Sequence, residues 1–368
     1  MANPDTATIR YIRPLIPGPE EWTPYLAESY RVRYFANRGP AASLFEKRLA
    51  EKYARGRAAI VAPNATAALV SALQALRVEG KVLTTSYTFP ATGHAILMAG
   101  CEPVFADISP TTWELDLAAA ARILEKGDIR AIMHVRAYGF GHDLAPLAAL
   151  AQEHGVPLIV DSAAGLGSGL SRTGHVGQQG DIEVFSLHAT KVFAIGEGAA
   201  LFMHRQHEEA FRTASNFGIR YPDVGGPGQN NKMSDFQAAV GLAVLDRIDS
   251  YIERRQAVVA RYHQALNGLD WIAHVHEPGL SPWQSYPVRL RAGKDLQRIM
   301  EQAAGLGLEL KRGYYQPLHR TTYFSRFTHV DLPVTDAVSE AVICMPVYSD
   351  MPMDMADKVL QLFIEAAR

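Results

Sequence analysis

The chain has 368 residues, of which 48% are hydrophobic and 20% are charged, and its net charge is −2. These values are typical of a globular protein and argue against a basic nucleic-acid-binding surface or a membrane-surface patch. The two cysteines, Cys101 and Cys344, lack CxxC spacing, which argues against a disulfide framework or a zinc site.

The first residues, Met-Ala-Asn-Pro-Asp, lack the basic region and apolar core of a signal peptide. No apolar run approaches the length that spans a membrane. We therefore expect a soluble cytoplasmic protein, with neither a nucleic acid nor a membrane as partner. The length favours two domains, or one large domain with an appendage.

From about residue 40 to residue 205, helical patterns alternate with short apolar runs. We expect helices at 42–53, 66–76, 90–99, 115–124 and 144–154, and strands at 58–62, 81–85, 103–106, 129–135, 157–160 and 199–203. This alternation predicts an α/β fold, with a mostly parallel sheet between two layers of helices. Functional residues are then expected at the carboxyl ends of the strands.

A long helix is expected to begin at Ser234, because Ser234 and Gln237 have the spacing of a capping box. Its apolar pattern continues through Ile248, and the remaining sequence mixes strand and helix patterns. We expect a large domain over residues 1–245, whose first 20 or so residues pack elsewhere, and a small α+β domain over residues 246–368.

Lys191 follows a short apolar strand that ends near Ser186, and the next apolar run begins after Gly196–Gly198. A lysine held among apolar residues at a strand end is a candidate for a lowered pKa and for Schiff-base chemistry. For a lysine considered alone, a solvated loop residue is the more common interpretation.

Three other segments complement this amine. The turn at 63–68 offers free backbone N–H groups for a phosphate, although a plain helix cap is the ordinary alternative. Asp161 ends a buried strand, where it can pair with a pyridine nitrogen or serve only as a turn residue. The segment 86–92 places an aromatic residue where it can stack on a ring or fill the core. An amine, an acid, a ring face and phosphate donors together match the needs of pyridoxal phosphate (PLP).

The chain also resembles a known family, the fold-type I PLP-dependent sugar aminotransferases of the DegT/DnrJ group. The resemblance extends over residues 10–365 in colinear order. Its most specific segments are Phe-Ser-Leu-His-Ala-Thr-Lys at 185–191 and Lys-Met-Ser-Asp-Phe-Gln-Ala-Ala at 232–239. Further matches lie at 39–46, 64–69, 88–92, 103–108, 138–143, 196–199, 228–230 and 317–319.

The resemblance implies roles for individual residues. Lys191 matches the lysine that binds the cofactor covalently, and Asp161 matches the partner of the pyridine nitrogen. Asn230 matches an asparagine that reaches the phosphate from the neighbouring subunit, which implies a homodimer with shared active sites. The other cofactor-binding matches are Phe89, which stacks on the ring, and Ala65, Thr66 and Ser186, which bind phosphate. The candidate substrate contacts are His188, Tyr314, Tyr315 and His319, for each of which a structural or surface role is an open alternative.

The implied reaction transfers an amino group from L-glutamate to a keto-sugar nucleotide, with pyridoxamine phosphate as the intermediate form of the cofactor. Within the group, the segment around Lys191 and the run Asn-Lys-Met-Ser at 231–234 look most like the 4-aminotransferases that make dTDP-4-amino-4,6-dideoxyglucose. The substrate is then expected to be a dTDP-4-keto-6-deoxyhexose. Relatives that dehydrate sugars carry histidine in place of Lys191.

Three alternatives stay open. The first is a PLP aminotransferase of the same group that acts on a cyclitol or another ketone. The chain also fits a non-catalytic PLP-binding or regulatory relative, because Ala164 stands where the family usually has glutamine or histidine. A metal hydrolase fits worst, since His207 lacks the second histidine of a zinc-binding helix and the pair His274 and His276 lacks a third ligand nearby. We therefore expect no metal site.

Overall fold

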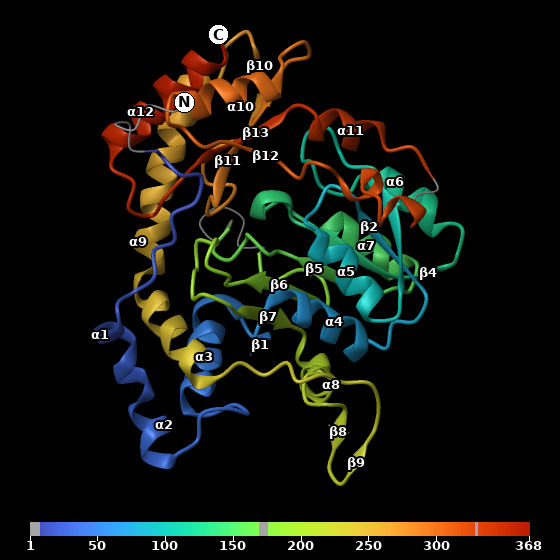
Figure 1. The fold of residues 1–368 in the computed structure, drawn as a ribbon. Helices are drawn as coiled ribbons and strands as arrows, with labels where there is room; N and C mark the ends of the chain where they lie inside the picture. The colour runs from blue at the N-terminus through green and yellow to red at the C-terminus, as the bar shows by residue number, and fades with distance from the viewer. Residues whose placement is uncertain (1–7, 169–175, 328–329) are drawn as a thin grey trace.

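The computed structural model describes residues 8–168, 176–327 and 330–368. Residues 1–7, on which the expected absence of a signal peptide rests, lie outside the described residues. A large seven-stranded sheet lies in the middle of the molecule, and a smaller four-stranded sheet lies above it (Figure 1). Among the described residues, no helix has both the length and the apolar character needed to cross a membrane.

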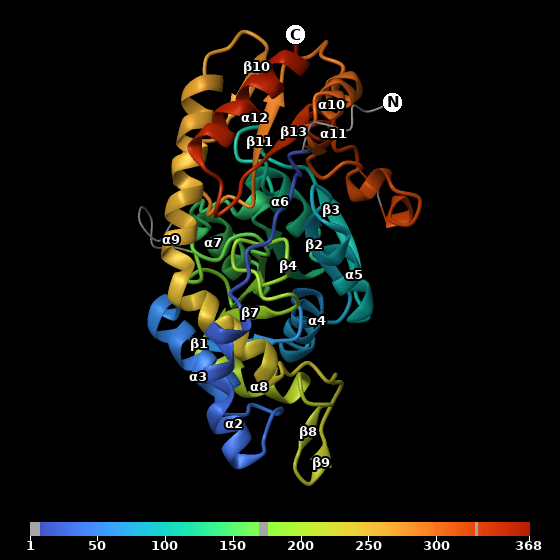
Figure 2. The same cartoon turned by 60° about the vertical axis from the view of Figure 1, so that its left-hand side comes forward.

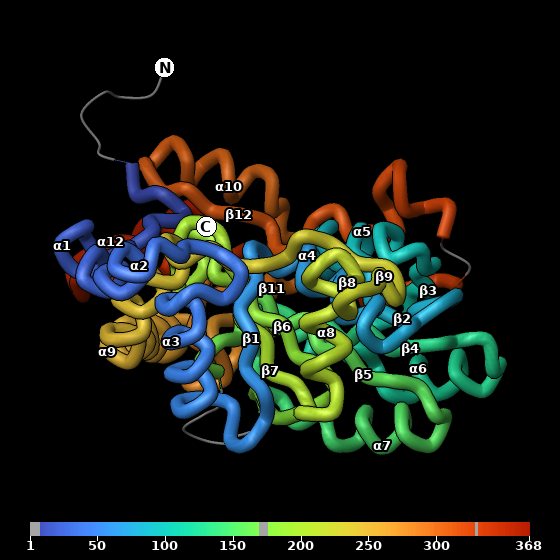
Figure 3. Tube along the Cα trace, turned by 90° about the horizontal axis from the view of Figure 1, so that it is seen from below, coloured from blue at the N-terminus to red at the C-terminus, as the bar shows by residue number. Residues whose placement is uncertain are grey.

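The large sheet confirms the predicted α/β fold. Its strand order is β1-β7-β6-β5-β4-β2-β3, which can be followed from below in Figure 3. β7 pairs antiparallel with β1 and β6, whereas the other neighbouring strands pair in parallel. The strands are β1 (Ala58–Ala62), β2 (Lys81–Thr85), β3 (Glu102–Ala106), β4 (Ile129–Val135), β5 (Leu158–Asp161), β6 (Ile182–Ser186) and β7 (Ala199–Met203).

Helices cover both faces of this sheet, which explains why its strands are nearly continuous apolar runs. One face packs against α4 (Ala65–Ala75), α5 (Pro90–Met98) and α8 (Glu208–Ala214). The other face packs against α6 (Leu117–Leu124) and α7 (Ala145–Glu153) on one half, and against α3 (Pro40–Leu49) and α9 (Asp235–Leu266) on the other half. The short helices α1 (Pro19–Trp22) and α2 (Ala27–Val32) lie beside the lower end of α9 (Figure 1).

α9 joins the two sheets. The Ser234 side chain accepts a hydrogen bond from the Gln237 amide, and the Gln237 side chain bonds the Ser234 amide, so the predicted capping box is present. From there α9 extends along one side of the molecule, from the base of the large sheet to the small sheet (Figures 1 and 2). One continuous helix therefore fixes the position of the C-terminal region.

The small sheet has the strand order β10-β11-β13-β12 and is antiparallel throughout its paired strands. Its elements are β10 (Ile272–Val275), β11 (Ser285–Leu290), β12 (Lys311–Arg312), β13 (Val342–Pro346), α10 (Leu296–Gly305), α11 (Pro333–Ser339) and α12 (Met353–Ala366). Its hydrophobic cluster includes Ile9 and Tyr11 from the start of the described chain, and Trp113 and Phe140 from the large-sheet region. Residues of both parts of the molecule thus contribute to this one cluster.

Candidate active site

The strand register brings three strand ends to one edge of the large sheet. Ala62, at the end of β1, and Ser186, at the end of β6, both pair with Ala199 of β7. Asp161 ends β5 and pairs with Val184 of β6. The residues that follow β1, β5 and β6 therefore lie at the same edge, where sites form in such sheets.

Lys191 lies on the connection between β6 and β7. This connection continues the strand pairing, because the Ala189 amide donates to the Gly196 carbonyl at 2.8 Å. The Lys191 amide then donates to the His188 carbonyl at 2.8 Å, which closes a tight turn. Gly196 has a φ of 94°, a left-handed conformation that strongly favours glycine. The lysine is therefore held on an ordered turn.

The amine of Lys191 is poorly solvated. Burial lowers the pKa of Lys191 to about 8, and the nearby Asp161 carboxylate opposes that shift. Nζ donates a hydrogen bond to Oε1 of Gln284 at 3.0 Å. A lysine with this pKa carries a substantial neutral fraction near neutral pH, which is the form that acts as nucleophile and base.

Asp161 is buried at 5% exposure and has two hydrogen-bond donors. Thr92, on α5, donates from Oγ1 to Oδ2 at 2.7 Å, and the Ala163 amide donates to Oδ1 at 3.2 Å. Burial raises the pKa of Asp161, and the two donors and the Lys191 charge act in the opposite direction. Thr88 lies 2.7 Å from Thr92, hydroxyl to hydroxyl, and continues this hydrogen-bonded chain.

A buried ion pair supports the turn after Asp161. Arg136 Nε donates to Oε1 of Glu183 at 3.0 Å, and neither side chain has solvent exposure. The same Glu183 oxygen accepts from the Ser162 hydroxyl at 2.5 Å. Ser162 directly follows Asp161, so this network fixes the backbone that carries the carboxylate.

We expect Thr92→Val to destabilise the protein and to raise the pKa of Asp161 further. The valine has nearly the same shape but leaves a buried carboxylate oxygen without its donor, which costs about 1–3 kcal/mol. Urea unfolding measures the free energy, and a PLP titration measures whether the less readily ionised carboxyl weakens cofactor binding. Thr23→Val, at an exposed position, is the control. An unchanged free energy of unfolding would contradict the assigned hydrogen bond.

The N-terminus of α4 has free donors. Asn64 caps the helix by accepting a hydrogen bond from the Ala67 amide at 2.8 Å. The Ala65 and Thr66 amides have no acceptor among the described residues. Ser186 Oγ accepts from the His188 amide at 3.3 Å, which leaves its own hydroxyl proton for another partner. Free amides at the positive end of a helix fit a phosphate group.

Phe89 presents an open ring face. It precedes the first residue of α5 and is 68% exposed, unlike other aromatic residues of this region. Tyr87 instead is buried, and its hydroxyl lies 2.8 Å from that of Tyr138. Phe89 rather than Tyr87 is therefore the aromatic residue with a face available for a flat ligand.

The four candidate substrate contacts differ in position. His188 lies three residues before Lys191, is 41% exposed at its side chain, and hydrogen-bonds Thr190 through Nδ1 at 2.9 Å. Tyr314 packs against Tyr87 and Tyr138. Burial raises the pKa of Tyr314, and the charge of the nearby Asp161 carboxylate raises it further. Tyr314 therefore lies near the acid, whereas His188 is close to Lys191 through the backbone of the turn.

His319 and Tyr315 have other contacts. Buried His319 bridges two segments, with Nδ1 2.7 Å from Ser86 Oγ and Nε2 3.0 Å from Asp336 Oδ1. The Tyr315 ring is covered by the Arg312 guanidinium, 3.3 Å from the ring centroid. These contacts are those expected of structural residues.

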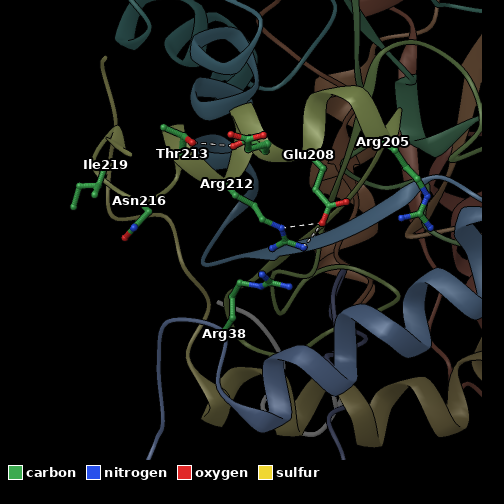
Figure 4. Close-up of a pocket in the computed structure, with 8 residues that line it drawn as sticks. Arg38, Arg205, Glu208, Arg212, Thr213, Asn216 and Ile219 are labelled. Carbon is green, nitrogen blue, oxygen red and sulfur yellow. Dashed lines mark hydrogen bonds and ion pairs between the residues drawn. The ribbon is translucent and has the colours of Figure 1, made fainter. Parts of the chain in front are cut away.

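Asn230 lies apart from Lys191 within the chain. It is exposed and lines a cavity of about 600 Å³ together with Arg212 and Lys232. A neighbouring cavity of about 510 Å³ extends along α8, where Arg212 pairs with Glu208 (Figure 4). Lys191 lines neither cavity.

Sequence reasoning missed two residues that contact the predicted pair. Thr92 belongs to the segment 86–92 and lies in the first turn of α5, but Thr88 precedes the helix, so helical spacing does not predict their contact. Gln284 reaches Lys191 from 93 residues away, and no local pattern predicts that contact. Across the described ranges, no group of three or more His, Cys, Asp or Glu side chains is arranged to hold a metal ion.

Comparison with known proteins gives consistent results. Residues 19–363 match the DegT/DnrJ/EryC1/StrS aminotransferase family. The dTDP-4-amino-4,6-dideoxy-D-glucose transaminase of Shigella dysenteriae is 30% identical over 96% of this chain and 97% of that protein. GDP-perosamine synthase of Caulobacter vibrioides is 29% identical, over 97% of each chain. The crystal structure of DesI in the presence of its TDP-sugar product has a TM-score of 0.90 and 30% identity, covering 100% of this chain and 95% of that one.

Proposed function

The chain belongs to the DegT/DnrJ/EryC1/StrS aminotransferase family and is a sugar aminotransferase; from this membership we propose that it transfers an amino group from L-glutamate to a dTDP-4-keto-6-deoxyhexose. The 30% identity to dTDP-4-amino-4,6-dideoxy-D-glucose transaminases from two organisms supports that nucleotide and sugar. We place the reaction in the cytoplasm, where buried free thiols such as Cys101 and Cys344 stay reduced.

The observation that carries the proposal is that Lys191 lies close to Asp161. A desolvated amine with a pKa of about 8 lies near a buried carboxylate at the carboxyl edge of the sheet. An amine of this kind forms imines with carbonyl compounds, and a nearby carboxylate suits a protonated ring nitrogen.

The described residues fit PLP, on which the family depends. We propose that Lys191 binds the aldehyde carbon and Asp161 the ring nitrogen. Phe89 would cover one ring face, and the free amides of Ala65 and Thr66, with the Ser186 hydroxyl, would bind the phosphate. When bound, PLP supplies an electron sink for the carbon that gains or loses a proton.

The protein's own residues move and hold the proton in this scheme. The Lys191 amine takes a proton from the donor carbon and later returns one to the acceptor carbon, as a general base and then a general acid. Asp161 keeps a negative charge beside the ring, and its two donors favour that charged form. The ordered turn around Lys191 limits the geometries that the amine can adopt.

We propose that the active protein is a homodimer with shared active sites. The hairpin of β8 (Ile219–Arg220) and β9 (Asp223–Val224) extends away from the body of the chain (Figures 1 and 2). It exposes Phe217 at 50%, Tyr221 at 95% and Val224 at 63%, which is unusual for a surface that stays in water. Exposed Asn230 and its cavity lie next to this hairpin, as expected of groups that complete a partner's site.

Mixed dimers test the shared site. Lys191→Ala and Asn230→Ala should each be nearly inactive alone, and coexpressed chains should recover activity well above either parent. Recovery follows because one site of each mixed dimer then combines an intact Lys191 with an intact Asn230 of the other chain. If mixed dimers form but stay as inactive as the parents, Asn230 does not act across the interface. Light scattering establishes the oligomeric state in each sample.

The acceptor is tested with the pyridoxamine phosphate form of the protein. We expect dTDP-4-keto-6-deoxyglucose to regenerate the visible absorption of PLP, and a free cyclitol ketone not to do so. A GDP-linked 4-keto-6-deoxysugar belongs in the same panel, because GDP-perosamine synthase is a relative of similar identity. A response to the GDP sugar alone, or to the cyclitol alone, would replace the proposed substrate.

A further inference from the structure

The Lys191 amine has one hydrogen-bond partner among the described residues, and that partner comes from the C-terminal region. Nζ donates to Gln284 Oε1 at 3.0 Å. The oxygens of the nearby Asp161 are engaged by Thr92 and the Ala163 amide instead. The direction in which the amine points therefore depends on Gln284, which directly precedes β11.

The backbone that carries Gln284 is held by a buried guanidinium. Arg255 of α9 is 4% exposed and donates through Nη1 to the Trp283 carbonyl at 2.8 Å and to the Val347 carbonyl at 2.7 Å. Its Nε donates to Ser349 Oγ at 2.7 Å. Burial lowers the pKa of Arg255 to about 10, so the side chain remains charged at neutral pH.

The residue before Gln284 is also fixed. Trp283 is fully buried and has a φ of 63°, a conformation that a bulky residue adopts only when its surroundings impose it. Its Nε1 donates to Gln256 of α9 at 3.0 Å, and its amide donates to the Ser281 hydroxyl at 3.1 Å. Gln284 is thus presented to Lys191 on a rigid segment.

We infer that Gln284 is a positioning residue for the amino transfer: its amide oxygen holds one N–H of Lys191 and orients the amine toward the reacting carbon. This inference rests on the proposed function. A neutral acceptor suits the task, because an amide oxygen orients an N–H without fixing the proton as strongly as a carboxylate does. The C-terminal region thereby contributes directly to the geometry of the catalytic amine.

The first test needs no cofactor. In the PLP-free protein, the rate at which acetic anhydride acylates Lys191 is measured against pH by peptide mass spectrometry. The wild-type midpoint should lie near 8, because only the neutral amine reacts. Gln284→Met removes the acceptor that favours the charged amine and should lower this midpoint by about one unit, and Gln284→Glu should raise it by about one unit or more.

The second test uses the loaded protein. Gln284→Met should lower kcat by about tenfold with little change in KM, since the amine is displaced while the substrate contacts remain. Gln302→Met, at an exposed position on α10, is the matched control and should change neither kcat nor the acylation midpoint. If Gln284→Met does not fold, Gln284→Asn, which withdraws the amide by one methylene group, should shift the midpoint in the same direction.

The outcomes separate the inference from the proposed function. An unchanged midpoint in folded Gln284→Met and Gln284→Glu proteins overturns the inference, as does a loss of affinity for the acceptor with normal kcat. If the midpoints shift as expected in a protein that transfers no amino group, the contact is supported and the proposed function is the part that fails.

Discussion

Replacing Lys191 with alanine is expected to remove both covalent cofactor binding and turnover. The lysine supplies the amine for the carbonyl and the base for the proton transfer, and general acid–base catalysis alone contributes about 10²- to 10⁴-fold. We therefore expect kcat to fall by at least about 10³-fold. Steady-state kinetics measure the loss, and borohydride reduction followed by peptide mapping should label Lys191 in the wild-type protein.

Two comparisons make this result specific. Lys358→Ala, at an exposed position on α12, should keep both the label and the activity. The unfolding midpoint of Lys191→Ala should not fall below that of the wild type, because the desolvation that lowers the pKa of Lys191 offsets its hydrogen bond to the neutral Gln284. Labelling of a different lysine, or a colourless wild-type protein in the presence of PLP, would refute the assignment.

Asp161→Asn is expected to lower kcat by about 10²- to 10³-fold, the size of effect seen when a preorganised electrostatic group is removed. Asparagine keeps the shape: its one oxygen can accept from the Ala163 amide, and its NH2 group can donate to the Thr92 hydroxyl, which then turns toward Thr88. It carries no charge for the ring nitrogen. Steady-state kinetics and the absorption spectrum of bound PLP measure the change. Asp161→Glu, which keeps the charge at a shifted position, should give an intermediate kcat.

The stability of Asp161→Asn provides the discriminating control. Burial raises the pKa of Asp161 in the folded protein above its value in the unfolded chain. The free energy of unfolding therefore falls as the pH rises from the unfolded pKa through the folded pKa, because ionising the buried carboxyl costs more than ionising the exposed one. At neutral pH, the asparagine variant should therefore unfold at the same urea concentration as the wild type, or at a higher one. Asp270→Asn, at an exposed position, should match the wild type in both assays. Full activity in Asp161→Asn would contradict the proposed role.

Some of the fold follows from local patterns. The apolar runs predict β1 and β7 with the bounds that the structure shows, and the Ser234–Gln237 spacing predicts the start of α9. Periodicity and capping act over a few residues, so they can be read without the rest of the chain. In place of one α-helix over 42–53, the structure has two segments: α3 ends at Leu49, and the π-helical segment Ala50–Ala54 follows it.

Other features depend on partners that are distant in sequence. Gly39, the residue before α3, has no side chain to cap the helix. Asp235 supplies the cap from α9, with its carboxylate accepting from the Ala41 amide at 3.1 Å and the Ala42 amide at 3.0 Å. No local rule predicts a cap that lies more than 190 residues away, because it depends on how α9 packs against α3.

The sequence by itself determined the fold class, and it predicted the amine and the acid. Asp161 ends β5 and Lys191 follows β6, and local hydrophobic patterns predict both as buried strands. Parallel strands bring their carboxyl ends to one edge. Only the tertiary structure decided what surrounds these two groups: Thr92 on the carboxylate, Gln284 on the amine, and His319 in a structural bridge between Ser86 and Asp336. The reason is physical, since hydrogen bonds between side chains act over about 3 Å and depend on the packing of elements from the whole chain.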